Sequence, residues 1–221
     1  MTFTAIVPVR AGSKGMPGKN LRPLAGVPLW RRAVDQALAA GASRVVVSTD
    51  IPEILAGAPL EGVTVLPRPE ALASDNTPMA PVILHAIESL GLKDTLVLLQ
   101  CTSPLRNTED IVAGVERFAK GGVDLVMSVT EADRSVLKYG RISDGTFTAL
   151  VDPSHPFTNR QSLPEVYRPN GAVYIFGADW FVGNGGFESD RIGALIMPSE
   201  RSADIDTEDD FLRIEARLRR E

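Results

Sequence analysis

The sequence has few or none of the features that mark disulfide-rich, membrane-spanning or secreted proteins. Cys101 is the one cysteine in 221 residues, which excludes an intramolecular disulfide and a cysteine-rich zinc site. No apolar run approaches the roughly 18 residues that span a bilayer. The opening MTFTAIVPVR lacks the charged and long apolar regions of a signal peptide. We therefore expect a cytoplasmic protein with no membrane-embedded part.

A surplus of positive charge is also missing. Lys and Arg number 23 against 28 Asp and Glu, which gives a net charge of −5 and a pI near 5.2. Such a chain has no overall attraction to nucleic acid or to an anionic membrane, so local cation clusters must bind any polyanion. The hydrophobic content of 44% is enough for a packed core. We predict one domain over residues 1–221, because a second independent domain would have to be small.

Short apolar runs alternate with helical patterns along most of the chain. This alternation is typical of an α/β fold with an open, mostly parallel sheet and helices on both faces. Apolar spacings of three and four predict helices that begin at Pro28, cover Ile83 to Leu90, and follow Asn107 and Thr207. Residues 131–168 carry turn formers and no clear helix, so we expect a hairpin arm and a loop outside the core. The expected strands are Phe3–Val9, Arg44–Ser48, Gly62–Leu66, Thr95–Leu99, Asp124–Val129, Gly171–Phe176 and Ala194–Met197.

The loop from Arg10 to Asn20 follows the first predicted strand. In an open parallel sheet, ligands bind where such strands end. Its three glycines allow close backbone approach to a phosphate, and Arg10, Lys14 and Lys19 add cations that suit a triphosphate. The glycine spacing does not match the dinucleotide-binding fingerprint, and Ser13 stands where the P-loop needs glycine. A surface turn rich in Gly and Lys is the alternative.

This loop resembles the signature of the acylneuraminate cytidylyltransferases, or CMP-sialic acid synthetases, which read approximately A-R-x-x-S-K-G-x-x-x-K-N after the first strand. The resemblance covers almost the whole chain, because further segments resemble the same family in the same order. These segments are Val47–Asp50, Arg68–Asp75, Leu99–Arg106, Arg168–Ile175 and Asp204–Glu208.

The resemblance implies a Rossmann-like nucleotidyltransferase fold and a cytidylyltransferase activity. The anomeric hydroxyl of a nonulosonic acid would attack the α-phosphate of CTP, with Mg²⁺ as cofactor and pyrophosphate as the leaving group. Residues 131–168 would be a dimerisation arm that reaches the partner's cleft in a homodimer. The implied catalytic residues are Arg10, Lys14 and Arg160, and the implied substrate-binding residues are Asn20, Arg68, Gln100, Arg168, Asn170, Tyr174 and Phe187.

Asp204 and Asp206 are the predicted metal ligands. They stand two residues apart, so both carboxylates face the same way on an extended segment. A few carboxylates together with substrate phosphates and water suit Mg²⁺. Asp206 or Thr207 could instead cap the last helix, but capping does not need both aspartates. We favour the metal interpretation.

Several alternatives stay open at this point. Gln100 could cap the turn that follows it instead of contacting the acceptor sugar, and Tyr174 could be a core residue. Members of the family that use N-acetylneuraminate often carry two adjacent aromatics near Phe187, whereas Glu188 follows here, so the choice of acceptor is open. The competing functions are a metal-dependent nucleotide-sugar glycosyltransferase, which has no use for the Arg10–Lys19 loop, and a non-catalytic nucleotide-binding homologue.

Overall fold

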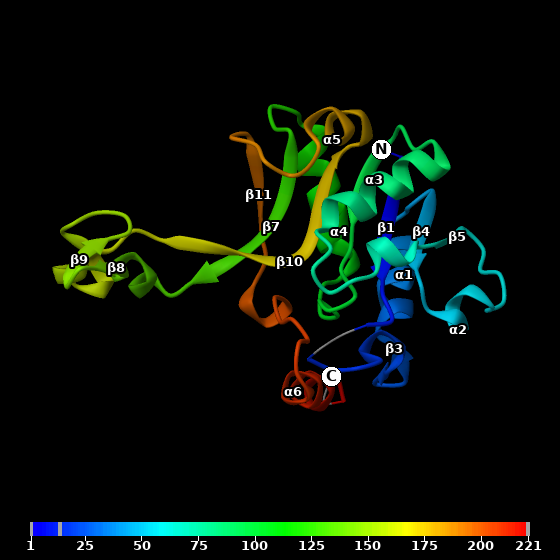
Figure 1. The fold of residues 1–221 in the computed structure, drawn as a ribbon, viewed down its shortest axis with the longest axis horizontal. Coiled ribbons are helices and arrows are strands. Elements are labelled where there is room, and N and C mark those ends of the chain that lie inside the picture. The colour runs from blue at the N-terminus through cyan, green and yellow to red at the C-terminus, as the bar shows by residue number, and fades with distance from the viewer. Residues whose placement is uncertain (1, 13–14, 220–221) are drawn as a thin grey trace.

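A twisted seven-stranded sheet forms the centre of the molecule in this computed structural model, which describes residues 2–12 and 15–219 (Figure 1). The strand order is β11-β7-β10-β6-β1-β4-β5. All strands of this sheet run parallel except β10, which is antiparallel to both of its neighbours. The strands are β1 (Phe3–Val9), β4 (Arg44–Thr49), β5 (Val63–Pro67), β6 (Thr95–Leu98), β7 (Leu125–Ala132), β10 (Val166–Gly177) and β11 (Ile192–Ile196).

Helices cover both faces of the sheet, as the sequence predicts. Along β1, Ala5 and Val7 face one apolar layer and Ile6 faces the other, because successive strand side chains point to opposite faces. The first layer contains α1 (Leu29–Ala39), α4 (Thr108–Ala119) and α6 (Glu208–Leu218). The second contains α3 (Met79–Leu90) and α5 (Ala178–Asn184). The fold class predicted from the alternating pattern is therefore confirmed.

Local signals in the sequence place the helix starts well. Asn107 and Asp110 form a reciprocal capping box at the start of α4, and Thr207 and Asp210 form another at the start of α6. Each box satisfies backbone N–H groups that have no partner in the first helical turn. The remaining short elements are α2 (Pro52–Leu55), the strand pairs β2 (Pro23–Leu24) with β3 (Val27–Pro28) and β8 (Gly140–Ser143) with β9 (Thr146–Ala149), and several 3₁₀ turns.

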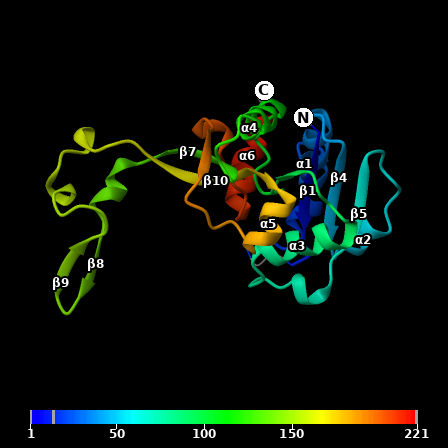
Figure 2. The same cartoon turned by 90° about the horizontal axis from the view of Figure 1, so that it is seen from above.

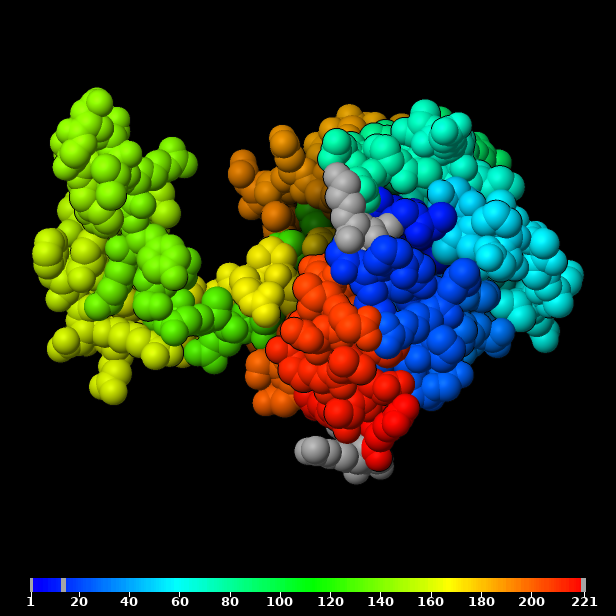
Figure 3. All heavy atoms as spheres, turned by 60° about the horizontal axis from the view of Figure 1, so that its bottom comes forward, coloured from blue at the N-terminus to red at the C-terminus, as the bar shows by residue number. Residues whose placement is uncertain are grey.

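Two long strands carry an arm away from the body. β7 continues past the predicted end at Val129 to Ala132, and β10 begins at Val166 instead of Gly171. The two strands pair antiparallel beyond the sheet, from Val166 opposite Ala132 to Pro169 opposite Val129. Figures 1 and 2 show the β8–β9 hairpin at the far end of this extension, and Figure 3 shows the arm standing apart from the body. The predicted excursion thus exists as a projecting hairpin arm.

The described helices are all too short or too polar to cross a membrane.

Candidate active site

A pocket of about 220 Å³ opens at the carboxyl end of β1. From β1 the strand order proceeds to β4 and β5 on one side and to β6 on the other, so this is a topological switch point of the sheet. Open α/β sheets bind ligands at such points. The lining residues come from the first loop, from loops after β5 and β6, and from the segment before α6: Pro8, Arg10, Gly12, Lys19, Asn20, Arg68, Met79, Gln100, Cys101, Thr102, Asp204 and Asp206.

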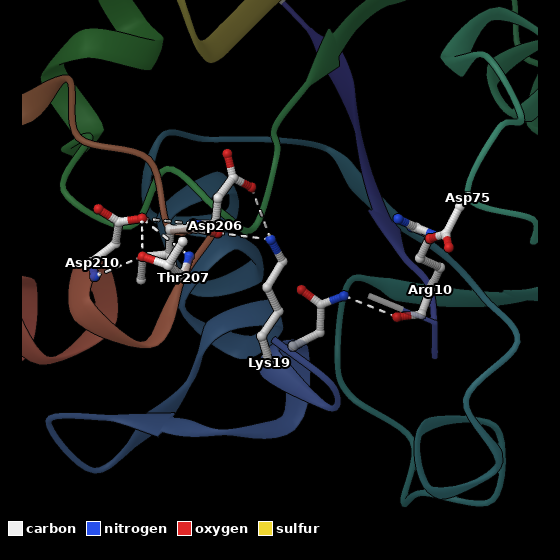
Figure 4. Close-up of polar contacts among 8 residues, drawn as sticks. Arg10, Lys19, Asp75, Asp206, Thr207 and Asp210 are labelled. Atoms are coloured by element: carbon white, nitrogen blue, oxygen red, sulfur yellow. Dashed lines mark hydrogen bonds and ion pairs between the residues drawn. The ribbon is translucent and has the colours of Figure 1, made fainter. Parts of the chain in front are cut away.

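The first loop brings Arg10 and Asn20 together. The Asn20 side-chain amide donates a hydrogen bond to the Arg10 carbonyl oxygen at 3.0 Å, while its buried Oδ1 has no hydrogen-bond partner among the described residues. The guanidinium of Arg10 forms an ion pair with Asp75, which comes from the loop before α3 (Figure 4). Both predicted residues therefore line the pocket. Lys14, the third residue predicted in this loop, lies outside the described residues.

Lys19 links the first loop to the segment before α6. It is 9% exposed, and its ammonium donates to the Ile205 carbonyl at 2.7 Å and lies 3.3 Å from Asp206 Oδ1 (Figure 4). Gly15 approaches the same segment so closely that a Cβ there would overlap the Asp206 carbonyl oxygen. A glycine is therefore required at position 15 for this backbone approach. These contacts hold the acidic segment against the first loop.

The structure separates the helix cap from the two predicted metal ligands. Thr207 is the N-cap of α6, so neither aspartate caps this helix. Asp204 and Asp206 both line the pocket. Burial raises the pKa of Asp204 above that of an ordinary aspartate, a hydrogen bond from Thr102 lowers it, and the neighbouring Asp206 charge raises it further.

The donor set fits a metal ion that keeps other ligands. The described residues contain no group of three or more His, Cys, Asp or Glu side chains that could enclose a cation. Two carboxylates beside Lys19 and Arg10 would therefore hold an ion only together with phosphate oxygens and water. That is the coordination that Mg²⁺ prefers.

Arg68 is a buried residue in the lining of the pocket. It is 7% exposed, and its Nη2 donates to the Ser48 carbonyl at 2.7 Å while its Nε donates to Ser48 Oγ at 3.2 Å. Burial lowers the pKa of Arg68, and the Asp50 carboxylate opposes that shift. Asp50 also accepts a hydrogen bond from the Ala11 backbone N–H at 2.8 Å, which fixes the start of the first loop.

Of three residues predicted to shape the acceptor site, Gln100 lines the pocket, whereas Tyr174 and Phe187 do not. The Tyr174 and Phe187 rings are 5.6 Å apart, within an aromatic cluster that also includes Phe176 and Phe181. Burial raises the pKa of Tyr174, and the charge of Asp204 adds to the shift. Phe187 also borders a shallow hollow that Glu188 and Asp190 line.

Arg160, Arg168 and Asn170 also do not line this pocket in the single chain. Arg160 lies in the arm, where its Nε is 3.0 Å from Asp133 and its side chain is 66% exposed. Arg168 is exposed on the part of β10 that pairs with the extension of β7. Asn170 is buried, and its side chain bonds to Ser128, Ser202 and the Ala172 backbone within the protein. Their roles stay predictions.

Sequence reasoning assigned no role to Asp75 and Thr102, and it treated Lys19 only as one of the first-loop cations that suit a triphosphate. No pattern in the sequence indicated that the Lys19 ammonium reaches a carbonyl 186 positions away. Asp75 and Thr102 stand in segments that resemble the family, and that resemblance is the signal that could have identified them.

The sequence of this chain is similar to those of known cytidylyltransferases. The family described as Cytidylyltransferase matches residues 4–177. The N-acylneuraminate cytidylyltransferase of Streptococcus agalactiae serotype III (strain NEM316) is 32% identical over 213 residues, which cover 95% of this chain. They cover only 51% of that protein, so the chain spans about half the length of such relatives. The CMP-N,N'-diacetyllegionaminic acid synthase of Legionella pneumophila is 33% identical, with 96% of this chain and 94% of that protein covered.

Solved structures show the same fold. The structure of CMP:2-keto-3-deoxy-manno-octonic acid synthetase complexed with CTP matches with a TM-score of 0.72 at 15% identity, covering 100% of this chain and 99% of the other. At that identity the match speaks for the fold alone. The family match over residues 4–177, which is most of the chain, leads to one conclusion. The chain belongs to the cytidylyltransferase family.

Proposed function

We propose that this protein transfers CMP from CTP to the anomeric hydroxyl of a nonulosonic, sialic-acid-type sugar and releases pyrophosphate, acting in the cytoplasm. One observation carries the proposal. A single pocket at the switch point of the sheet brings together the cations Arg10, Lys19 and Arg68 and the carboxylates Asp204 and Asp206. The relatives that carry names of this activity supply the choice of CTP and of the sugar class.

The cations would act on the triphosphate. Negative charge builds up on phosphate oxygens as the α-phosphate is attacked, and positioned cations in a partly buried site stabilise it. Arg10 extends from the end of β1, and Lys19 is held by the Ile205 carbonyl, so both groups are oriented before the substrate arrives. Arg10 would exchange its contact with Asp75 for a contact with phosphate. Arg68, buried beside β4, would face the cytidine end.

Asp204 and Asp206 would hold Mg²⁺ together with phosphate oxygens and water. Bound there, the ion would neutralise charge on the triphosphate and help to orient it. The protein contributes the alignment of the two carboxylates. Lys19 fixes the backbone of Ile205 between them, and Thr102 accepts the Ile205 N–H at its carbonyl at 2.8 Å.

The acceptor would bind between Gln100 and the Tyr174–Phe187 pair. Aromatic faces suit the apolar side of a sugar ring and its acyl substituents, while the Gln100 amide can both donate and accept hydrogen bonds. Glu188 is exposed directly after Phe187 and borders the adjoining hollow. A carboxylate there favours an acceptor whose substituents donate hydrogen bonds.

The arm would make the protein a homodimer with shared sites. Its described surface exposes large apolar side chains, among them Ile142 at 78%, Val151 at 63% and Phe157 at 90%. Exposed apolar groups gathered on one projecting element favour a protein interface. Arg160, which lies far from the pocket of its own chain, could then meet the acceptor's carboxylate in the partner's site. A monomer in light scattering at micromolar concentration would count against this arrangement.

The activity is tested by pyrophosphate release with CTP, Mg²⁺ and a panel of acceptors. The panel comprises N-acetylneuraminate, deaminated neuraminate, legionaminate, pseudaminate and the eight-carbon keto-deoxyoctonate. We expect release with CTP and at least one nine-carbon acceptor, and none without acceptor. Silence with every acceptor contradicts the catalytic assignment. Activity with GTP and not with CTP contradicts the assignment of the base.

A further inference from the structure

Arg106 has a charged side chain that is entirely enclosed by the protein. It is 2% exposed and is the largest of the fully buried side chains. Its Nη1 donates to two backbone carbonyls, those of Gln100 and Ala172, at 2.8 Å each. The first follows β6 and the second belongs to β10. One guanidinium nitrogen therefore ties together two main-chain segments that meet beside the pocket.

The segment of β10 around Ala172 lies outside the regular strand pairing of the sheet. Its regular pairing with β7 is interrupted between Pro169 and Tyr174, and its pairing with β6 begins only at Tyr174. Gly171, inside the interruption, has a φ of 76°, a conformation that favours glycine. The position of a Cβ on Gly171 lies 4.0 Å from the Gln100 side-chain amide. Gln100 thus rests against a stretch of backbone that lies outside the regular strand pairing.

Side chains form hydrogen bonds to the β10 backbone where its regular pairing is interrupted. Arg106 binds the Ala172 carbonyl, Ser128 Oγ accepts the Val173 N–H at 2.8 Å, and Asn170 Oδ1 accepts the Ala172 N–H at 3.2 Å. Of these groups, only Arg106 also binds the main chain of Gln100. Arg106 therefore links the Gln100 main chain to the β10 backbone beyond Leu98 and Tyr174, where the pairing of β6 with β10 ends.

The burial of the Arg106 guanidinium is unfavourable for the stability of the fold. Nε and Nη2 of Arg106 have no hydrogen-bond partner among the described residues. Burial lowers the pKa of Arg106 to about 10, so the group is still charged at neutral pH. The nearby Asp110 is already paired with Arg201 at 2.7 Å. A buried charge without a full set of partners destabilises a protein, and an apolar side chain would fill this space at less cost.

We propose that Arg106 is a positioning residue for the acceptor sugar, which it affects by fixing the Gln100 main chain against the Gly171–Ala172 backbone. This inference rests on the proposed function, because Gln100 is assigned there to the acceptor. Arg106 itself touches no substrate. CTP, whose proposed contacts are Arg10, Lys19 and Arg68, should be bound without its help.

The test compares Arg106→Lys with Arg32→Lys. Arg32 is a matched control, because its Nη2 also donates to a backbone carbonyl, that of Leu24 at 2.8 Å, and burial lowers its pKa as well. Arg32 does not line the pocket. Steady-state rates use CTP and the panel acceptor that the wild-type enzyme turns over fastest. In Arg106→Lys we expect KM for the acceptor to rise about tenfold or more and KM for CTP to change less than about twofold. Arg32→Lys should leave both values unchanged.

A double substitution shows whether Arg106 acts through Gln100. If it does, Gln100→Ala and Arg106→Lys together should raise the acceptor KM hardly more than Gln100→Ala alone. Additive effects, or equal losses for CTP and acceptor, overturn the proposal. If Arg106→Lys is not folded by circular dichroism, Arg106→Gln takes its place. Failure of both variants to fold also overturns it, since Arg106 is then a scaffold residue.

Hydrogen exchange separates this inference from the proposed function. In Arg106→Lys, amides of residues 100–103 and 170–174 should exchange faster, with residues 44–49 in β4 unchanged. Unchanged exchange at both segments overturns the positioning role even if the wild-type enzyme is active. A wild-type enzyme that is silent with every acceptor contradicts the proposed function, whatever the exchange shows.

Discussion

The ammonium of Lys19 donates a hydrogen bond to the backbone carbonyl of Ile205 at 2.7 Å, across 186 positions of the chain. Ile205 stands between Asp204 and Asp206, so this bond sets the height of both carboxylates above the first loop. Figure 3 shows the same neighbourhood at the surface, where segments from the beginning and the end of the sequence lie against each other. An ion pair between Arg22 and Glu208 adds to this contact.

Lys19→Met should remove a phosphate-binding cation and loosen the acidic segment. We expect kcat/KM for CTP to fall about 100-fold or more, the scale on which one lost charge-stabilising donor acts. The matched control is Lys120→Met, since Lys120 is exposed at the end of α4. Steady-state kinetics on variants with native circular dichroism check the prediction. A loss of less than about threefold would show that Lys19 only supports the fold.

Gly15→Ala should disturb the site through the backbone. The added methyl group would overlap the Asp206 carbonyl, so the acidic segment must shift. We expect a higher Mg²⁺ concentration for half-maximal rate and a loss of about 1–3 kcal/mol in the free energy of unfolding. Gly183→Ala is the control, because a Cβ there would meet nothing within 4 Å and Gly183 does not line the pocket. Equal behaviour of the two variants in a magnesium titration would contradict the close approach.

Asp206→Asn should abolish turnover and leave stability nearly unchanged. The side chain is 74% exposed and caps no helix, so its loss costs little folding energy. Asp209→Asn removes the same charge from the first turn of α6, away from the pocket, and should keep full activity. Rates across a magnesium series and thermal unfolding distinguish the two. Active Asp206→Asn enzyme would exclude this carboxylate as a metal ligand.

The thiol of Cys101 should be unreactive in the folded protein. Burial raises its pKa from 9.0 to about 12, and the thiolate is the reactive form. Because the folded pKa is the higher one, stability from the neutral thiol is fully present below pH 9.0 and is lost as pH rises toward about 12. Iodoacetamide at pH 8 should label Cys101 only after unfolding in guanidinium. Fast labelling of the native protein would contradict the enclosed environment.

Phe157→Asp should weaken the proposed dimer. Phe157 is 90% exposed on the arm, so a charge there leaves the monomer fold intact and opposes apolar contact with a partner. We expect at least a tenfold rise in the dimer dissociation constant, about 1.4 kcal/mol. Val182→Asp, on α5 of the body with 48% exposure, should not change it. Sedimentation at several concentrations measures both. An unchanged dimer would place the interface elsewhere.

The sequence predicts those parts of the fold that depend on short-range patterns. The bounds of β1 and the starts of α4 and α6 agree with the apolar run Phe3–Val9 and with the cap residues Asn107 and Thr207, because burial and capping are local properties. The direction of β10 is not local. A buried strand looks the same whichever way it runs, and its antiparallel placement follows from the arm that joins it to β7.

The difference between local sequence patterns and non-local contacts also decides which parts of the site could be predicted. Arg10, Asn20, Gln100, Asp204 and Asp206 were predicted as site residues, and the structure brings them together around one pocket. The Lys19–Ile205 hydrogen bond could not be predicted, nor could the hydrogen bonds from Arg106 to the Gln100 and Ala172 carbonyls. Each depends on which segments the sheet places side by side. Arg160 marks the opposite case, because it pairs with Asp133 in the arm and does not line the pocket of its own chain.

The position of Asp204 and Asp206 after β11 has a consequence for the protein during synthesis. A nascent chain that has emerged only through Ile196 contains every strand of the main sheet and the arm but neither carboxylate. Such a chain also lacks Ile205, Phe211 and Ile214, which belong to the first apolar layer. The segment that completes this layer thus also supplies both proposed metal ligands, so a chain with an incomplete core would lack the proposed catalytic site.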